Sequence, residues 1–178
     1  MKKLKLEELG RISVEEFKET QKIPVVVVLD NIRSMHNVGS VFRTSDAFLI
    51  EKIYLCGITG RPPHKDIRKT ALGATESVDW EYAQDAILLI DRLKSEGYKI
   101  ISVEQTDGSI QLTDYKPDLN TKYALIFGNE VEGVQQKLID KSEVCLEVPQ
   151  DGTKHSLNVS VCAGIVLWKF FRKFSMKG

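Results

Sequence analysis

The run of five apolar residues from Val25 to Leu29 constrains the fold of this chain most strongly. Four of the five are β-branched valines, and no polar side chain interrupts the run. A strand with one face in water alternates apolar and polar residues, whereas a strand covered on both faces reads as a continuous apolar run. The segment therefore predicts a central strand of a parallel sheet with helices on each side.

Other short apolar runs predict further strands, and they alternate with segments of helical periodicity. This alternation is typical of an α/β domain with a mainly parallel sheet. The expected strands are 52–56, 98–103, 123–127 and 144–148, with a short extended piece at 77–80. The expected helices are 38–48, 83–96, a short one that ends near Asp140, and a long one that begins at Ser156.

Three local signals refine this pattern. Residues 4–21 have the spacing of an amphipathic helix, and Ser13 followed by Glu16 matches a capping box, so two helical pieces are possible. Asn37 is expected to cap the helix that follows it. The segment 57–70 is rich in turn formers and in bases, and it predicts a long functional loop.

The final helix is apolar around nearly its whole circumference. Such a helix is buried in a core or between subunits, and the pattern leaves both open. Its expected first turn is polar, with Ser156 and Asn158. Free backbone N–H groups at a helix start suit a polar or anionic ligand, although Ser156 as a simple cap explains the same residues.

Composition sets broader bounds. A length of 178 residues predicts one domain with a real core. Lys+Arg and Asp+Glu number 25 each, but bases gather near both ends of the chain, which suits an anionic partner or a solvated basic surface. Cys56, Cys145 and Cys162 lie in apolar runs without metal-ligand spacing, which predicts reduced core cysteines in a cytoplasmic protein and no metal site. No signal peptide or membrane span is expected.

Three polar, glycine-containing segments follow predicted strands: Asn31–Arg43, Gly128–Gly133 and Pro149–Asn158. Ligands of open α/β sheets bind outside the carboxyl ends of the strands, so these segments are expected to converge. Their glycines form neither the dinucleotide fingerprint nor the phosphate loop, which leaves an ordinary nicotinamide or phosphate-loop enzyme unsupported.

The same three segments carry a resemblance to a known family. HNVGSVFRTSDAF, LIFGNEVEGV and VPQDGTKHSLNVSVCAGIVL resemble, in order, the three motifs of the SpoU (TrmH-like) RNA ribose 2′-O-methyltransferases. The resemblance implies the SPOUT fold, in which the C-terminal segment of an α/β sheet forms a trefoil knot. It also implies S-adenosylmethionine as cofactor, RNA as substrate and a homodimer. The motifs place the methyltransferase domain at 24–178 and leave 1–23 as an N-terminal helical extension.

The resemblance also implies roles for individual residues, each numbered as in this chain. Catalytic roles fall on Arg43, Asn37, Glu130, Ser156 and Asn158. Cofactor-binding roles fall on Gly128, Asn129, Gly133, Val148, Leu157 and Glu104. The bases expected to contact RNA are Arg33, Arg61, Lys65, Arg68 and Lys69.

The implied reaction moves a methyl group from a sulfonium to a ribose 2′-hydroxyl, which must lose its proton as it attacks. Arg43 is the family's usual candidate for the base. A guanidinium normally stays protonated, so Arg43 suits a phosphate clamp better, and a water or an RNA phosphate remains open as the base.

Ordinary structural roles compete with these assignments: a surface ion pair for Arg43, a turn cap for Glu130 and a buried amide for Asn158. A non-catalytic RNA-binding protein with the same fold is the rival function. Many relatives carry an additional N-terminal RNA-binding domain for which this chain has no room, and this favours tRNA over rRNA as substrate.

Overall fold

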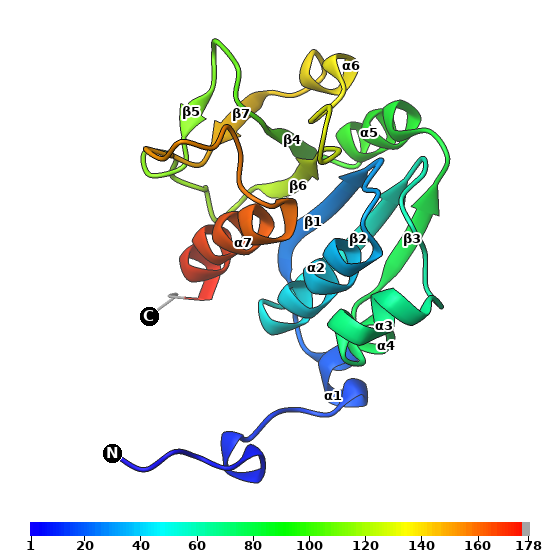
Figure 1. Cartoon of the computed structure of the whole chain (residues 1–178), viewed down its shortest axis with the longest axis vertical. Coiled ribbons are helices and arrows are strands. Elements are labelled where there is room, and N and C mark those ends of the chain that lie inside the picture. The colour runs from blue at the N-terminus through cyan, green and yellow to red at the C-terminus, as the bar shows by residue number, and fades with distance from the viewer. Residues whose placement is uncertain (176–178) are drawn as a thin grey trace.

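The computed structural model describes residues 1–175, apart from the side chains of residues 6 and 7. Its centre is a seven-stranded sheet in the order β3-β2-β1-β6-β4-β7-β5, in which every pair of neighbours is parallel (Figure 1). The predicted α/β fold with a parallel sheet is confirmed, and the strand order is consistent with the expected C-terminal knot. The strands are β1 (Ile23–Asp30), β2 (Ile50–Cys56), β3 (Trp80–Ala83), β4 (Tyr98–Val103), β5 (Ile110–Gln111), β6 (Lys122–Phe127) and β7 (Val144–Glu147).

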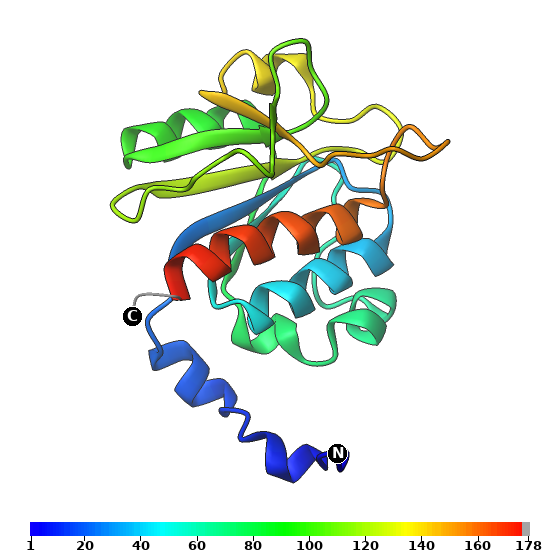
Figure 2. The same ribbon diagram turned by 90° about the vertical axis from the view of Figure 1, so that its left-hand side faces the viewer.

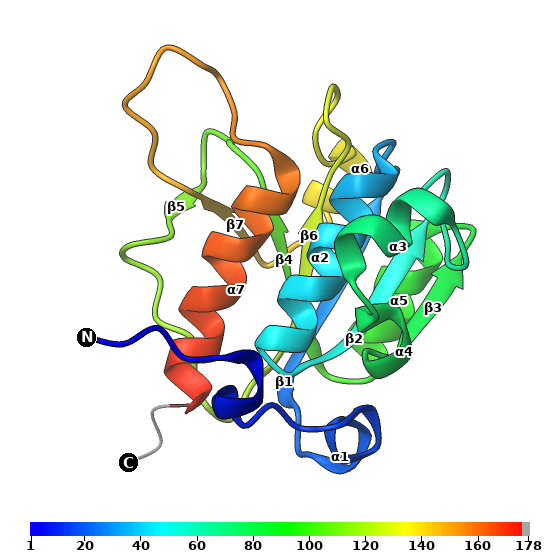
Figure 3. The same cartoon turned by 60° about the horizontal axis from the view of Figure 1, so that its bottom comes forward.

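Helices cover both faces of the sheet. On one face lie α2 (Met35–Ala47), α3 (Lys65–Ala71), α4 (Ala74–Ser77) and α7 (Val159–Ser175). On the other lie α5 (Ala86–Ser95) and the short α6 (Gln136–Ile139). Figure 2 shows α2 and α7 side by side beneath the sheet with α5 on its far side, and Figure 3 shows α7, α2 and α3 in a row.

The central strand is buried on both faces, as its sequence predicts. Val25, Val27 and Leu29 belong to the core beneath α2 and α7, and Val26 and Val28 belong to the core beneath α5. All five are at most 1% exposed. One strand thus joins the two cores and fixes the positions of the polar residues that follow it.

The predicted loop 57–70 is wrong in its second half, because residues from Lys65 onward form α3. The Nδ1 atom of His64 accepts a hydrogen bond from the Asp66 backbone N–H at 3.2 Å and caps this helix. Ile67 and Ala71, one turn apart, are buried in the core that contains α2. The bases Lys65, Arg68 and Lys69 therefore lie on a helix.

The predicted helix starts also need correction. Asn37 does not cap α2, because the helix begins at Met35 and the Ser34 hydroxyl accepts the hydrogen bond from the Asn37 N–H at 3.3 Å. The final helix begins at Val159, so Ser156 lies in the loop before it. The expected helix 83–96 begins at Ala86, after an Asp85 cap.

Three short elements depart from the expected pattern. The extended piece expected at 77–80 is wrong except at Trp80, because Ser77 ends α4 and the strand β3 begins only at Trp80. Sequence reasoning missed α4 itself and the two-residue β5, which extends the sheet beyond β7. Elements of two to four residues are too short to show a periodicity.

The N-terminal residues form two helical pieces. A 3-10 helix, η1 (Leu6–Leu9), precedes α1 (Val14–Glu19), and the predicted capping box of Ser13 and Glu16 is present. Phe17 is buried and anchors α1 to the core. The division into an extension and a domain stays a prediction, and residues 176–178 of that domain lie outside the described residues.

The cysteines are free, as expected, but only Cys56 is buried, whereas Cys145 and Cys162 are half-buried. Within residues 1–175, no group of three or more His, Cys, Asp or Glu side chains is placed to hold a metal ion. No helix of the described chain has the length and apolar character needed to cross a membrane.

Candidate functional site

The three polar segments meet between β1 and β6, where the order of the strands in the sheet reverses. From β1 the chain passes through α2 to β2 in one half of the sheet, and from β6 it passes through α6 to β7 in the other half. Ligands of open α/β sheets bind at such a switch point. Here the Asn129 side-chain amide donates to the Asn31 carbonyl at 2.7 Å and joins the first two segments.

Glu130 is the centre of this junction. Its carboxylate accepts hydrogen bonds from the backbone N–H groups of Arg33 and Ser34 and from Asn37 Nδ2, each at 3.0 Å. Burial acts to raise the pKa of Glu130, but these hydrogen bonds outweigh it and lower the pKa below the ordinary value. Glu130 is therefore an ionised group that holds the start of α2 against the loop after β6.

Asn158 brings in the third segment. Its Nδ2 atom donates to Asn37 Oδ1 at 3.1 Å, and its Oδ1 atom accepts from the Ser160 N–H at 2.9 Å. The second contact satisfies a free N–H at the start of α7, so Asn158 is the cap of that helix. One amide thus couples the start of α7 to the start of α2.

A cavity of about 480 Å³ adjoins this junction. The residues assigned above to cofactor binding all line it, together with Glu130, Ser156 and Asn158, although their roles stay predictions. Those assigned residues are Gly128, Asn129, Gly133, Val148, Leu157 and Glu104. Asn37 and Arg43 do not line this cavity.

The close packing of one loop shapes the cavity wall. A Cβ at Gly128 would lie 2.1 Å from the carbonyl carbon of Gly133 and from the Val134 nitrogen, so only glycine fits there. Glu104 supports the same loop, because its Oε2 accepts a hydrogen bond from the Val134 N–H at 2.9 Å. Backbone and carboxylate groups therefore lie together on one side of the cavity.

Apolar side chains complete the lining. Phe127, Leu146 and Val148 come from the sheet and its end, and Val159 and Cys162 come from the first turn of α7. Burial, with a smaller effect from Glu104, raises the pKa of Cys162 to about 11, so the thiol is neutral at physiological pH. The cavity suits a ligand with one apolar part and one cationic part.

Sequence reasoning missed Cys162 as a lining residue. The signal in the sequence was its place one turn after Asn158, which puts both residues near the same helix start. Ser156 is exposed on the cavity rim, and its side chain makes no hydrogen bond to another described residue.

Arg43 lies apart from the junction. It lies six positions after Asn37 in α2, and this spacing places the two residues about 9 Å apart along the helix axis and about 240° apart around it. Arg43 is exposed and lines a different cavity of about 700 Å³, with Arg11 and Phe17 of the N-terminal segment. Within residues 1–175 it forms no ion pair, and the structure does not bring it to Glu130.

The predicted RNA-contacting bases are spread over the same end of the molecule. Arg33 is exposed beside Glu130, and the Arg61 guanidinium lies 4.2 Å from the centre of the Tyr82 ring. Lys69 pairs with Asp66 at 2.9 Å, which reduces the positive charge that α3 presents. Lys65 and Arg68 are exposed on that helix, and their roles stay predictions.

Comparison with known proteins identifies the family. The model of the SpoU rRNA Methylase family matches residues 24–168, which include all three segments of the junction. The chain belongs to this family. The expected family membership is thereby confirmed.

Individual relatives agree with this assignment. A Staphylococcus aureus (strain MSSA476) protein, provisionally named a TrmH family tRNA/rRNA methyltransferase, is 27% identical over 90% of this chain and 63% of its own length. The A. aeolicus TrmH/SpoU tRNA modifying enzyme has the same fold, with a TM-score of 0.82 at 24% identity over 93% of this chain and 84% of its own. An AdoMet-bound rRNA methyltransferase from Sinorhizobium meliloti has a TM-score of 0.79 at 24% identity, over 88% of this chain and 59% of its own.

The chain spans about 63% of the length of the curated relatives it matches. Likeness at these identities establishes the fold of a SpoU protein. It leaves the activity, the substrate and the partners to be argued from the site.

Proposed function

We propose that this protein is an S-adenosylmethionine-dependent RNA methyltransferase that acts on a ribose 2′-hydroxyl. Family membership and the two RNA-modifying enzymes of the same fold support methylation of RNA. The ribose as target rests on the three motifs. The observation that carries the proposal is the hydrogen-bonded chain from Glu130 through Asn37 to Asn158, because it joins all three motifs beside one cavity.

The cavity residues fit S-adenosylmethionine. Its adenine needs an apolar surface and backbone polar groups, which Phe127, Leu146 and the Gly128–Gly133 loop offer. Its sulfonium and ammonium are cationic, and the carboxylates of Glu104 and Glu130 line the same cavity. When bound, the cofactor supplies an electrophilic methyl group to the ribose oxygen.

The residues of this chain then have distinct tasks. Glu130, Asn37 and Asn158 hold the ends of β1 and β6 and the start of α7 in one geometry, which fixes the cavity wall relative to the substrate. Arg43 binds the phosphate beside the reacting ribose and aligns the hydroxyl, because a planar guanidinium holds a phosphate through two hydrogen bonds. Ser156, on the rim, contacts the substrate or the cofactor.

The proposed enzyme is a homodimer. Three apolar residues on one side of α7 are exposed: Val161 by 52%, Ile165 by 40% and Trp168 by 51%. Phe48, next to Ala47 at the end of α2, extends this surface, with its ring centre 5.6 Å from that of Trp168. A continuous apolar surface of this kind favours self-association around a two-fold axis.

This surface also suggests how Arg43 reaches the chemistry. Arg43 and Ala47, one turn apart, are exposed on α2 beside Phe48. A second copy packed on α7 and Phe48 would therefore have Arg43 at its border. We assign the phosphate clamp of each site to Arg43 of the opposite protomer in that dimer.

Methylation with labelled S-adenosylmethionine tests the proposal. Purified protein is incubated with total RNA, with tRNA and with rRNA in separate reactions, and the modified nucleotide is mapped. We expect a 2′-O-methylated ribose in tRNA, which we propose as the preferred substrate. In the cell, we propose that the enzyme acts in the cytoplasm. RNA binding without cofactor binding or methyl transfer would instead support the non-catalytic alternative, and a methylated base would exclude the ribose.

A further inference from the structure

A second large cavity lies beside the proposed active site and takes no part in it. It has a volume of about 890 Å³ and lies between α5 and the carboxyl ends of β1, β2 and β3. We call it the α5 groove. Pockets for small ligands typically have volumes of about 300–1,000 Å³, so the α5 groove can hold a nucleoside.

The α5 groove adjoins the junction described above. Asn31 lines the groove, and its carbonyl accepts the hydrogen bond from Asn129, the residue before Glu130. Gln135, two residues after Gly133, also lines it. A group bound in the groove would therefore lie next to the junction that fixes the wall of the proposed cofactor cavity.

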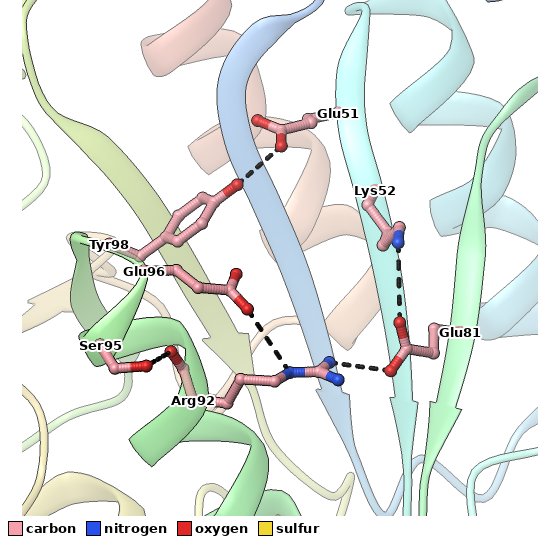
Figure 4. Close-up of polar contacts among 7 residues, drawn as sticks. All are labelled: Glu51, Lys52, Glu81, Arg92, Ser95, Glu96 and Tyr98. Atoms are coloured by element: carbon pink, nitrogen blue, oxygen red, sulfur yellow. Dashed lines mark hydrogen bonds and ion pairs between the residues drawn. The ribbon is translucent and has the colours of Figure 1, made fainter.

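One wall of the groove is a charge network whose groups are already paired. Arg92 donates to Glu81 at 2.8 Å, and Lys52 lies 3.6 Å from the same carboxylate (Figure 4). The hydrogen bond from Arg92 lowers the pKa of Glu81, so this pair is ionised at neutral pH. Among the described residues that line the groove, Arg92 is the single base, and its charge is neutralised by this partner.

Two further carboxylates, those of Asp30 and Asp85, line the groove. Asp30 is 1% exposed, and its carboxylate accepts from Gln135 Nε2 at 2.9 and 3.0 Å and from Asn31 Nδ2 at 2.9 Å. The exposed Gln135 amide thus covers a buried carboxylate with an NH₂ group, and a ligand NH₂ group could take its place.

Asp85 provides a more accessible acceptor. Its Oδ1 atom caps α5 through hydrogen bonds from the N–H groups of Ile87 and Leu88 at 2.7 and 3.2 Å. Its Oδ2 atom makes no hydrogen bond to another described residue, and no described base pairs with it. Ala86, Ile87 and Leu88 form an apolar wall beside it, and Leu88 is 68% exposed.

This lining disfavours a phosphate and favours a flat, partly apolar ligand that donates hydrogen bonds. A carboxylate with an unused oxygen accepts well from the exocyclic amino group of a base, as in the contact of Asp or Glu with cytosine N4. Arg61 stacks on the ring of Tyr82, a lining residue, and its guanidinium can contact a phosphate outside the groove. Base recognition inside and phosphate contact outside is the usual division in RNA binding.

We propose that the α5 groove binds an amino-bearing nucleobase of the substrate RNA, with Asp85 and Asp30 as the acceptors of its amino group. This inference rests on the proposed function for the identity of the polymer. The groove would select the base near the methylated ribose, while the 480 Å³ cavity holds the cofactor for the methyl transfer.

Cytidine and uridine provide a matched pair of probes, because they differ in an amino group against a carbonyl at position 4. We expect cytidine to shift the backbone NMR signals of Ala83–Leu89 in the ¹⁵N-labelled protein, and uridine to leave them unchanged. The variant Asp85→Asn keeps a good helix cap and removes the carboxylate. It should weaken cytidine binding about tenfold, in the range that a specific base contact supplies.

The control is Asp91→Asn, on the same helix. Asp91 pairs with Lys141 at 2.6 Å and does not line the groove, so cytidine binding should be unchanged. Equal shifts with both nucleosides, or cytidine shifts confined to Gly128–Gly133, would overturn the inference. So would equal cytidine affinity of the Asp85→Asn and Asp91→Asn variants.

Methylation kinetics separate this inference from the proposed function. Asp85→Asn should raise KM for RNA about tenfold while kcat and cofactor affinity stay at the wild-type values. If the wild type methylates RNA but Asp85→Asn leaves KM unchanged, the groove is refuted and the function stands. If the wild type transfers no methyl group yet cytidine shifts the α5 signals, the function is refuted and the nucleobase site stands.

Discussion

Replacing Gly39 by alanine should destabilise the protein by about 2 kcal/mol. Gly39 lies in α2 where α3 crosses it, and an added Cβ would lie 2.1 Å from Thr70 Oγ1 and 2.3 Å from the Ile67 carbonyl oxygen. The Thr70 side chain could rotate away, but the carbonyl belongs to the backbone of α3. Overpacking of this kind costs about 1–3 kcal/mol, and a contact with backbone belongs at the upper end. The higher helix propensity of alanine returns up to about 1 kcal/mol.

Urea unfolding followed by circular dichroism measures this change. We expect a lower midpoint at an unchanged m-value, and a melting temperature lower by roughly 4–8 °C for a chain of this length. Combining the substitution with Thr70→Ala should recover little of the loss, because the Ile67 carbonyl remains in place.

The control is Gly164→Ala, the same substitution within α7. A Cβ there would meet nothing within 4 Å in a single protomer, so stability should rise by up to about 1 kcal/mol. A Gly39→Ala protein within about 0.5 kcal/mol of wild type would refute the close crossing of α2 and α3. A clear loss at Gly164 would place that residue in an interface with a second copy.

Four further experiments test the site and the proposed function. Arg43→Ala should lower turnover by at least about a hundredfold with cofactor affinity unchanged, and Arg43→Lys should also fail because an ammonium cannot form the two-pronged phosphate contact; near-normal turnover would remove Arg43 from the mechanism. Iodoacetamide should alkylate Cys162 about a hundredfold more slowly at pH 8 than a thiol with an ordinary pKa, with the rate rising as the pH approaches the pKa of about 11; fast reaction at pH 8 would contradict the raised pKa of this thiol. Trp168→Glu should convert a dimer into monomers in sedimentation velocity and abolish activity, whereas an active wild-type monomer at low micromolar concentration would exclude the dimer. Charge reversal of four bases should lower the salt slope of RNA binding by about 0.9 for each phosphate that the protein no longer neutralises. The four are Arg61, Lys65, Arg68 and Lys69, and an unchanged slope would exclude them as phosphate contacts.

The elements with strong local signals were predictable from the sequence. The valine run predicted β1 within a few residues, because a continuous apolar run has one common interpretation in an α/β domain. The strand 98–103 was predicted with the bounds that the structure has. The helix α3 was not predicted, because Gly60, Pro62 and Pro63 mark a loop and only Ile67 and Ala71 carry the helical spacing.

In the site, likewise, features that depend on tertiary contacts could not be predicted from local sequence. Ser34 and Asn37 are both good helix caps, and local sequence cannot choose between them. The choice depends on Glu130, 93 residues later in the chain, which binds the Asn37 side chain and leaves the cap to Ser34. The separation of Arg43 from Glu130 likewise depends on the direction in which α2 crosses the sheet, and no motif encodes that direction.

The charge network on β2 and β3 has a consequence for aggregation. Parallel sheets normally have both faces covered by helices, but here charged side chains rather than a further helix cover part of the α5 face, where Lys52 and Arg92 lie over the Tyr54 ring. An edge strand next to an apolar surface is a template for pairing with another chain. Lys52, Glu81 and Arg92 thus act as gatekeeper residues, which prevent the β3 edge from pairing with another chain at high protein concentration. Replacing them with aliphatic residues to enlarge the core would remove this protection. A variant designed in this way for higher stability would therefore aggregate.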